Sequence, residues 1–517
     1  MSTRTAGNLA DLVREAAATS PAKTALLFRG AATTWAELDA RVSAVAAGLT
    51  NLGLARGDRV ALQLGNTPDF PACYFGVLRA GLVAVPVNTG YTAQEVEHLM
   101  TDSGAQVLIT SRSGAADLAS RPAHLIVAGT DAASDTVPDT VPDTVPDGAL
   151  TLDALLAAGE DVGSVGGGED LALVLYTSGT SGRPRGAMLT HRALLANLEQ
   201  CSRITPPVTA PEDVLLLVLP LFHVYGLNAA LGALAWHGAT GVLVERFDPV
   251  ETLEEVRRHG VTNLFGAPPM YVAWSMLPDV GDAFTSVRLA LSGAAPLPPA
   301  VLDRVRDTTG HHVFEGYGLT ETAPVLTSTL MSEVAKPGSI GRAVPGVELR
   351  LLDERGAPVE EGDPGEVVVR GANLFSGYWP DGVEGPDADG WFATGDVAIV
   401  DDDGDLHLVD RRRELVLVSG FNVYPREVEE VLTAHPGIDE AAVLGIAHPY
   451  TGESVKALVV LRAGAQLSAE EVIAHCARSL ARFKCPTAVE FLPELPHSAT
   501  GKVSKGRLRQ AAAGHPE

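Results

Sequence analysis

The first 110 residues alternate between helix-like and strand-like hydrophobic patterns. Over residues 34–54, apolar side chains recur at Leu38, Val42, Val45 and Leu49, which is the spacing of an amphipathic helix. Short apolar runs that suit strands, and one further helical segment, follow at 58–64, 82–88, 93–102 and 106–110. Because strands and helices alternate, the pattern predicts a largely parallel sheet that helices cover.

A continuous apolar run, LALVLY at 171–176, predicts a strand that is buried on both faces. Thr190 then predicts the N-cap of a helix that carries Leu194, Leu195 and Leu198 on one side. Upstream of both, residues 135–147 read DTVPDTVPDTVPD. Proline at every fourth position forbids a helix and weakens a sheet, so this repeat predicts a solvated loop.

The most apolar stretch, residues 214–244, predicts a buried strand, loop and helix. It contains Pro220, His223, Asn228 and His237 together with four glycines. A helix that spans a membrane rarely carries so many polar and helix-breaking residues. We therefore expect no membrane span in this protein.

The pattern changes twice in the last third of the chain. From residue 347, short strands separated by Gly and Asp turns predict an antiparallel, barrel-like unit over 346–409. Beyond it, Pro425 predicts a helix start, and Ser468 with Glu471 predicts a capping box before a helix that reaches Leu480. The expected fold class is α/β. The expected domains are an N-terminal domain (1–409), a hinge (410–414) and a small mobile α+β C-terminal domain (415–517).

The charge balance excludes nucleic acid as a partner. The chain has 517 residues, with 38 Lys and Arg against 64 Asp and Glu, for a net charge of −26. A surface this acidic repels a phosphate backbone. The charge is uneven, because residues 411–517 hold 13 basic and 12 acidic residues and the rest of the chain carries −27. This break in charge coincides with the predicted hinge.

The four cysteines, at positions 73, 201, 476 and 485, form no CxxC pair. They predict structural thiols in a reducing compartment. The N-terminal residues contain no apolar segment of the kind that a secretion signal needs. We therefore expect a cytoplasmic protein.

Residues 177–185 combine small residues, hydroxyls and two arginines directly after the buried strand. Small residues let backbone N–H groups converge, hydroxyls add donors and Arg185 adds charge, a set that suits a polyphosphate. No GKS or GKT follows, so this is not the Walker pattern. Composition alone supports a flexible Ser/Gly loop equally well.

The segment YTSGTSG, followed by PRG, resembles the phosphate loop of the adenylate-forming superfamily of acyl-CoA synthetases, adenylation domains and luciferases. Two residues depart from the family pattern: Ser181 replaces a threonine and Arg185 replaces a lysine. Serine keeps the hydroxyl, whereas arginine exchanges a compact ammonium for a planar fork. By this resemblance, the loop residues that bind ATP would be Thr177, Ser178, Gly179, Thr180, Ser181, Gly182 and Arg185.

Further segments resemble the nucleotide motifs of the same family. They are SGAAPL (292–297), EGYGLTE (315–321) and WFATGDVA (391–398). The resemblance implies that Tyr317 stacks on adenine, Thr320 contacts the α-phosphate and Glu321 binds Mg²⁺, while Asp396 accepts hydrogen bonds from the ribose. These roles suit a flat aromatic ring and a hard carboxylate oxygen. The other implied nucleotide-binding residues are Ala294, Ala295, Pro296, Glu315, Gly316 and Gly318.

The C-terminal segments resemble the hinge, the thiol tunnel and the catalytic lysine motif of the family. Arg411 would reach the ribose or a phosphate, and Arg413 stands at the hinge, where the family often has Asp or Lys. CoA would pass Ser419, Gly420 and Phe421, since a glycine lets a pantetheine arm approach the backbone. Lys502, in TGK, matches the catalytic lysine.

The segment LPLFHVYG resembles the part of the family that lies beside the acyl group, so the implied acyl contacts are Phe222, His223, Tyr225 and Gly226. A carboxylic acid is already ionised at pH 7 and needs no base. We therefore interpret His223 as lining the pocket. Phe222 and Tyr225 serve equally well as core residues. Residues 213–245 and 315–335 contain no Lys or Arg. The expected acyl pocket therefore lacks a cation for a second carboxylate, which disfavours a dicarboxylate substrate.

The resemblance implies an ATP-dependent acyl-CoA synthetase with Mg²⁺ as cofactor and CoA as cosubstrate. A medium- or long-chain fatty acid is the expected substrate, and an aryl-acid CoA ligase remains an alternative. Transfer to a separate carrier protein, a nucleotide-binding module without turnover and a luciferase-like oxygenase also remain open. Peripheral membrane contact and homo-oligomerisation are left undecided.

Overall fold

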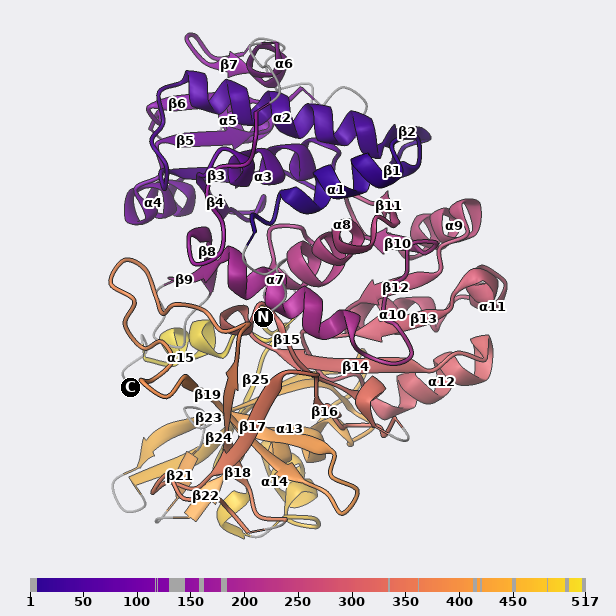
Figure 1. The fold of residues 1–517 in the computed structure, drawn as a ribbon. Coiled ribbons are helices and arrows are strands. Elements are labelled where there is room, and N and C mark those ends of the chain that lie inside the picture. The colour runs from indigo at the N-terminus through magenta and orange to yellow at the C-terminus, as the bar shows by residue number, and fades with distance from the viewer. Residues whose placement is uncertain are drawn as a thin grey trace.

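A seven-stranded sheet forms the N-terminal part of the computed structural model (Figure 1). The structure describes residues 7–116, 118, 120–129, 145–157, 162–177, 184–332, 335–360, 362–411, 416–418, 421–448, 452–480, 482–497 and 502–513. In sheet order the strands are β7 (Leu150–Thr151), β6 (His124–Val127), β5 (Val107–Thr110), β3 (Arg59–Gln63), β4 (Val83–Pro86), β8 (Leu171–Thr177) and β9 (Arg185–Thr190). They pair in parallel up to β8, as the alternating pattern predicted, and β8 then pairs with β9 in an antiparallel hairpin.

A second, nine-stranded sheet follows. Its order is β16 (Arg342–Ala343), β15 (Val325–Ser328), β14 (Val313–Gly318), β13 (Leu289–Ser292), β12 (Asn263–Gly266), β10 (Val214–Leu217), β11 (Thr240–Leu243), β1 (Thr24–Phe28) and β2 (Ala31–Thr34). The central strands β11, β10, β12, β13 and β14 are parallel, so their carboxyl ends lie at one edge. Ligands of open α/β sheets bind at such an edge.

Helices cover both sheets, and several begin where the sequence places a capping residue. Thr34 and Thr92 form capping boxes with Glu37 and Glu95, and Thr190 accepts a hydrogen bond from Ala193 N, as predicted. The helices of this region are α1 (Asp11–Thr19), α2 (Trp35–Asn51), α3 (Asp69–Arg79), α4 (Ala93–Ser103), α5 (Arg112–Ala116), α6 (Leu152–Leu156), α7 (His191–Ser202), α8 (Ala233–His237), α9 (Pro249–His259), α10 (Pro268–Trp274), α11 (Val280–Ala283) and α12 (Pro299–Thr309).

The apolar stretch 214–244 folds as the predicted buried strand, loop and helix, and it ends in a second buried strand, β11, that the prediction did not include. Its helix opens with a π-helical segment, η2 (Tyr225–Gly232), which continues directly into α8. Segments of this kind are rare and often lie at functional sites. Within the part of the chain that the structure describes, no helix is long and apolar enough to cross a membrane.

The β-rich unit is an antiparallel sheet in the order β17 (Val347–Leu352), β18 (Gly365–Gly371), β19 (Trp391–Val400) and β20 (Leu406–Arg411). Its strand order is open, so the four strands form a sheet and do not close into a barrel. A hairpin at Asp403-Gly404 joins β19 to β20, and Gly404 takes the left-handed φ of +87° that such a turn requires. A backbone bridge from Leu406 to Gly341 ties this sheet to the larger body.

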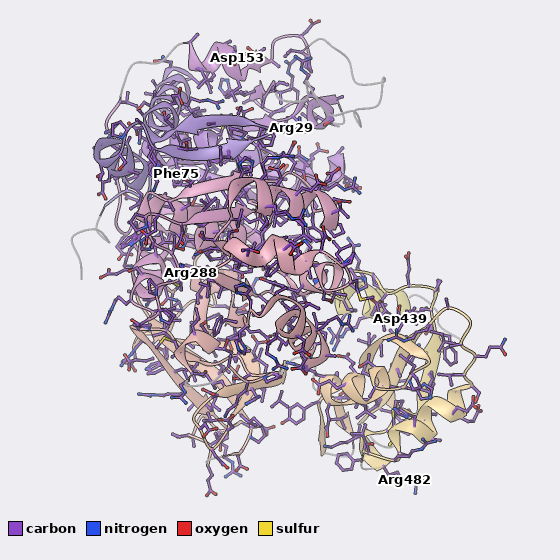
Figure 2. All side chains as sticks on the ribbon, turned by 90° about the vertical axis from the view of Figure 1, so that its right-hand side faces the viewer. Arg29, Phe75, Asp153, Arg288, Asp439 and Arg482 are labelled. Carbon is purple, nitrogen blue, oxygen red and sulfur yellow. The ribbon has the colours of Figure 1, made fainter. Side chains whose placement is uncertain are left out.

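The C-terminal unit has its own sheet and its own hydrophobic core. Its strands are β22 (Phe421–Val423), β21 (Val416–Val418), β24 (Gly452–Leu461), β23 (Ile438–His448) and β25 (Ala488–Phe491), and its helices are α13 (Pro425–Thr433), α14 (Ala469–Cys476) and α15 (Lys505–Ala513). The Ser468–Glu471 capping box forms as predicted, but α14 ends at Cys476, so Leu480 lies beyond the helix. In Figure 2 this unit, on which Asp439 and Arg482 are labelled, lies to the side of the larger body. In Figure 1, helix α15 lies between the C-terminal unit and the larger body.

Candidate active site

A cavity of about 2260 Å³ that is open to solvent is lined by residues of the large body, the β-rich unit and the C-terminal unit. Most of the side chains that the sequence predicted as site residues line it, although they come from segments far apart in the chain. These residues are Thr177, Arg185, Phe222, His223, Tyr225, Ala294, Ala295, Pro296, Glu315, Gly316, Tyr317, Gly318, Thr320, Glu321, Asp396 and Lys502. A volume of this size accommodates a nucleotide together with a second substrate.

The turn after β13 forms one wall of the cavity. Ala294 takes a left-handed φ of 70°, which is unusual for a residue with a side chain and bends the backbone sharply at this point. At Gly293, an added Cβ would lie 2.9 Å from the ring of Tyr225, so only glycine lets this turn pack against that ring. The turn therefore brings backbone groups close to the cavity, as an adenine-side loop requires.

Glu315 is a buried carboxyl group beside this turn. One oxygen accepts a hydrogen bond from Leu297 N at 3.1 Å, and the other is buried without a hydrogen-bond partner. Burial raises the pKa of Glu315 to about 7, although the hydrogen bond from Leu297 and the charge of Arg426 act in the opposite direction. Ser292 is opposite Glu315 in the parallel register, and its hydroxyl is also buried without a partner. These two polar groups are available to a ligand in the cavity.

Tyr317 and Asp396 are joined across two sheets. The Tyr317 hydroxyl donates to Asp396 Oδ2 at 2.6 Å, and both residues are buried. Asp396 lies within β19 and faces Arg411 of β20 in the register, so it belongs to an extended strand and not to a turn. The hydrogen bond fixes the tyrosine ring beside the carboxylate that the sequence assigns to the ribose.

Gly318 brings the nucleotide motif into close contact with the chain that follows. A Cβ at this position would lie 1.7 Å from Pro324 O, so no other residue fits. The next residues form the short helix η4 (Thr320–Thr322). It presents Thr320 and Glu321 to the cavity.

Glu321 belongs to a chain of polar contacts. Its Oε1 accepts a hydrogen bond from the Tyr378 hydroxyl at 2.6 Å. The Arg185 guanidinium lies 3.6 Å from the centre of the Tyr378 ring and forms an ion pair with Glu384 at 2.9 Å. The sequence analysis predicted Arg185 and Glu321 as site residues but missed Tyr378 and Glu384. Arg185 and Glu384 are 199 positions apart in the sequence, so no local pattern indicates that they form a contact.

His223 is uncharged in this site. Its Nδ1 accepts the Tyr225 N–H at 3.3 Å, so the proton of the neutral ring is assigned to Nε2. Burial, and then the nearby positive charge of Lys502, lower the pKa of His223 to about 4. A ring of this kind donates a hydrogen bond through Nε2. The electrostatic effect also places Lys502 of the C-terminal unit near the pocket of the large body.

One part of the cavity lining, called the apolar branch below, comes from α7, η2, α8, β12 and the segment that follows α7. Its residues are Leu198, Cys201, Ile204, Val208, Thr209, Ala229, Ala233, Trp236 and Phe265, and none of them is Lys or Arg; the polar side chains of Asn197, Ser202 and His237 line the cavity from the same helices. Among these residues, Thr209 has a buried hydroxyl without a hydrogen-bond partner. Gly226 is not among the residues that line the cavity, and a Cβ added at this position would lie 2.5 Å from Pro220 O.

Several predicted residues lie outside the described residues: Ser178, Gly179, Thr180, Ser181, Gly182, Arg413, Ser419 and Gly420. For Arg411 and Phe421 the structure describes the backbone, which lies in β20 and β22. The sequence reasoning also missed four basic side chains from the C-terminal unit that line the cavity: Arg426, Lys505, Arg507 and Arg509. The near-neutral charge of residues 411–517 was the only feature of the sequence that pointed to them.

Comparison with known proteins places the chain in a family. The family model for the AMP-binding enzyme matches residues 13–379, and that for the AMP-binding enzyme C-terminal domain matches 427–502. A long-chain-fatty-acid–CoA ligase of Yersinia pestis is 36% identical, with 97% of this chain and 94% of the relative covered. A feruloyl-CoA synthase of an Amycolatopsis species is 37% identical, with 95% and 96% covered.

The solved structures of MatB from Rhodopseudomonas palustris share the fold. The ATP-bound form has a TM-score of 0.86 at 34% identity, with 98% of this chain and 99% of that chain covered. The apo form has a TM-score of 0.75. The described arrangement of this protein is thus more similar to the nucleotide-bound form. These findings confirm the fold class and the resemblance drawn from the motifs: the chain belongs to the AMP-binding enzyme family.

Proposed function

We propose that this protein is a cytoplasmic AMP-forming acyl-CoA synthetase that acts on a medium- or long-chain fatty acid. It would join the acid to AMP with release of pyrophosphate, and then transfer the acyl group to CoA with release of AMP. The main support for this proposal is that Lys502, the nucleotide motif around Tyr317 and the apolar branch line the same cavity. The cysteines that the structure describes are free, as a reducing compartment requires.

In the first half-reaction a carboxylate oxygen attacks the α-phosphorus, and the bond to pyrophosphate breaks. No protein nucleophile is needed, so the protein acts by positioning the reactants and stabilising negative charge. Lys502 and Thr320 would stabilise the α-phosphate, Arg185 would bind the leaving phosphates, and the His223 Nε2–H would donate to the carboxylate. Asp396 would accept from the ribose hydroxyls.

The residues of the cavity fit Mg²⁺. Glu321 offers a hard carboxylate oxygen at the cavity wall, and Mg²⁺ is usually held by one or two carboxylates together with substrate phosphates. No group of three or more metal-binding side chains occurs among the described residues, which agrees with a metal that arrives with ATP. When bound, Mg²⁺ would neutralise charge on the phosphate oxygens.

The second half-reaction requires a different arrangement of the C-terminal unit. A thiol must attack the acyl carbon that Lys502 approaches in the first half-reaction. We infer that the unit rotates about the hinge at 410–414, so that Lys502 leaves and the segment around Gly420 takes its place. The separate core of this unit supports such a rotation, since its packing is complete without the larger body.

The apolar branch supports a fatty acid as substrate. A second carboxylate in this branch would be buried without a cation, which is costly. A panel of carboxylates with ATP, Mg²⁺ and CoA tests the proposal, with AMP and acyl-CoA as measured products. We expect turnover with medium- and long-chain alkyl acids, and at least about a hundredfold lower kcat/KM with dicarboxylates. Preference for a dicarboxylate would contradict it.

Two substitutions separate the half-reactions. Lys502→Ala is expected to abolish ATP–pyrophosphate exchange while leaving thioester formation from supplied acyl-AMP. Gly420→Leu is expected to spare the exchange and block transfer to CoA. Lys456→Ala is the matched control, because Lys456 pairs with Glu490 on the surface of the same unit. Equal loss of both half-reactions in either variant would refute the rotation.

A second candidate substrate, a hydroxylated aryl acid, is favoured by one observation. The unpartnered hydroxyl of Thr209 in the apolar branch would pair with a polar group on the far end of the acid. The carboxylate panel therefore includes ferulate beside the alkyl acids. Thr209→Val would lower ferulate turnover and leave alkyl acids unchanged if this second candidate is correct.

A further inference from the structure

A short loop, residues 377–385, lies against β9 and contacts Arg185 at the end of the predicted phosphate loop. Backbone hydrogen bonds tie it to that strand: Met188 N donates to Gly377 O, and Trp379 N donates to Gly186 O. Within the loop, Tyr378 N donates to Val383 O. The position of Tyr378 relative to Arg185 is therefore fixed by the backbone of both segments.

Tyr378 connects this loop to Glu321. Its hydroxyl donates to Glu321 Oε1 at 2.6 Å. The hydrogen bond limits the orientations that the Glu321 carboxylate can adopt.

Arg185 uses two properties that the family's lysine lacks. Its planar guanidinium lies over the Tyr378 ring at 3.6 Å, and its Nη1 binds Glu384 at the same time. A lysine ammonium is a single point of charge and does not combine stacking with a directed ion pair in this way. The departure from the family pattern at Arg185 therefore has a structural counterpart in this chain.

Glu384 is held in an unfavourable backbone conformation at the ion pair. Its φ is 54°, in the left-handed region that residues with side chains rarely adopt. The side chain is more than half exposed, so water and other anions can reach it. An ion pair of this exposure is weak and exchanges readily with a competing anion.

We propose that Tyr378 is a positioning residue for Glu321 and Arg185, and that Glu384 occupies Arg185 until the triphosphate of ATP displaces it. The proposal rests on the proposed function, because it takes ATP as the ligand of the cavity. The exchange breaks the ion pair between Arg185 and Glu384 and forms an ion pair between Arg185 and a phosphate. The tyrosine ring keeps the guanidinium in place during the exchange.

ATP binding by isothermal titration calorimetry, with and without Mg²⁺, tests the role of Glu384 in the full chain. Glu384→Gln removes the competing charge and is expected to tighten ATP binding by about threefold, the size of an exposed ion pair. Glu348→Gln is the control, because it removes an equal charge from an exposed pair with Arg370 elsewhere in the β-rich unit. In an Arg185→Lys background, Glu384→Gln is expected to have no larger effect than the control.

Tyr378→Phe tests the positioning role, since it keeps the ring and removes only the hydroxyl. We expect the factor by which Mg²⁺ increases ATP affinity to fall about fivefold, because one hydrogen bond to a carboxylate is lost. The ATP affinity in the absence of Mg²⁺ should be unchanged. Equal losses with and without Mg²⁺ would assign Tyr378 a purely structural role and overturn this part. Equal ATP affinity in the wild type, Glu384→Gln and Glu348→Gln would overturn the displacement. No ATP binding by the wild type would instead contradict the proposed function itself.

Discussion

Glu315→Gln is expected to stabilise this protein at alkaline pH and to have little effect at acid pH. Glu315 is 6% exposed, and burial raises its pKa from 4.5 to about 7. Between these values the folded state binds a proton that the unfolded state has released, so the stability of the wild type falls as pH rises through this window. Glutamine keeps an acceptor for Leu297 N and carries no charge.

The size of the effect follows from the two pKa values. Their separation corresponds to about 3 kcal/mol of unfolding free energy, fully present below pH 4.5 and lost above pH 7. Because part of this is already lost at pH 5, the unfolding free energy of Glu315→Gln relative to the wild type should increase by about 2.5 kcal/mol between pH 5 and pH 8. The wild type and the variant differ in only one ionisable group, the buried carboxyl of Glu315, so the pH dependence of their difference reports on that group.

Urea unfolding followed by tryptophan fluorescence at pH 5, 6, 7 and 8 measures this difference. All five tryptophans precede residue 410, so the fluorescence reports on the body that contains Glu315. Glu354→Gln, at an exposed turn position, is the control. Parallel pH curves for the wild type and Glu315→Gln would refute the reasoning, because they would mean that Glu315 ionises at the same pH in the folded and unfolded states.

Three further results are expected. Gly318→Ala should destabilise the body by about 3 kcal/mol, since a Cβ there would lie 1.7 Å from Pro324 O, whereas Gly316→Ala meets an ordinary 3.5 Å contact; equal thermal transitions would contradict this. Burial lowers the pKa of His223 to about 4, so pyrophosphate exchange between pH 5.5 and 8 should have the same profile in the wild type and in His223→Gln; an ionisation near pH 6.5 that the variant lacks would contradict it. Ala233→Phe should shorten the alkyl acids accepted, judged by the ratio of kcat/KM for sixteen and eight carbons, because Ala233 lines the apolar branch; an unchanged ratio would exclude that branch as the acyl site.

Local chemistry allowed much of the fold to be predicted. Thr190 caps α7, and Ser468 forms its capping box with Glu471, because these interactions involve residues only three positions apart. The strand assignments held for the same reason, since burial on one or both faces imposes a pattern that is visible in a few residues. The extent of α14 was overestimated, because apolar spacing alone does not mark where a helix ends.

The contacts of the candidate site could not be predicted in this way. Tyr317 reaches Asp396 across 79 positions, and Tyr378 reaches Glu321 across 57. The motifs identified Tyr317, Asp396 and Glu321 one at a time, through family resemblance. Their pairing depends on how β14 and β19 are placed relative to each other, and no short segment contains that information.

The sequence by itself determined the alternation of strands and helices, the helix caps and the motifs of the nucleotide site. It also determined the change after residue 346 to short strands separated by Gly and Asp turns. Each of these features depends on neighbouring residues or on a short pattern. Only the tertiary structure decided that β8 returns as the antiparallel strand β9, and that burial gives Glu315 and His223 their shifted pKa values. The physical reason is that burial and electrostatics depend on every group packed around a side chain. The neutral His223 results from its surroundings, which include Lys502 from the far end of the chain.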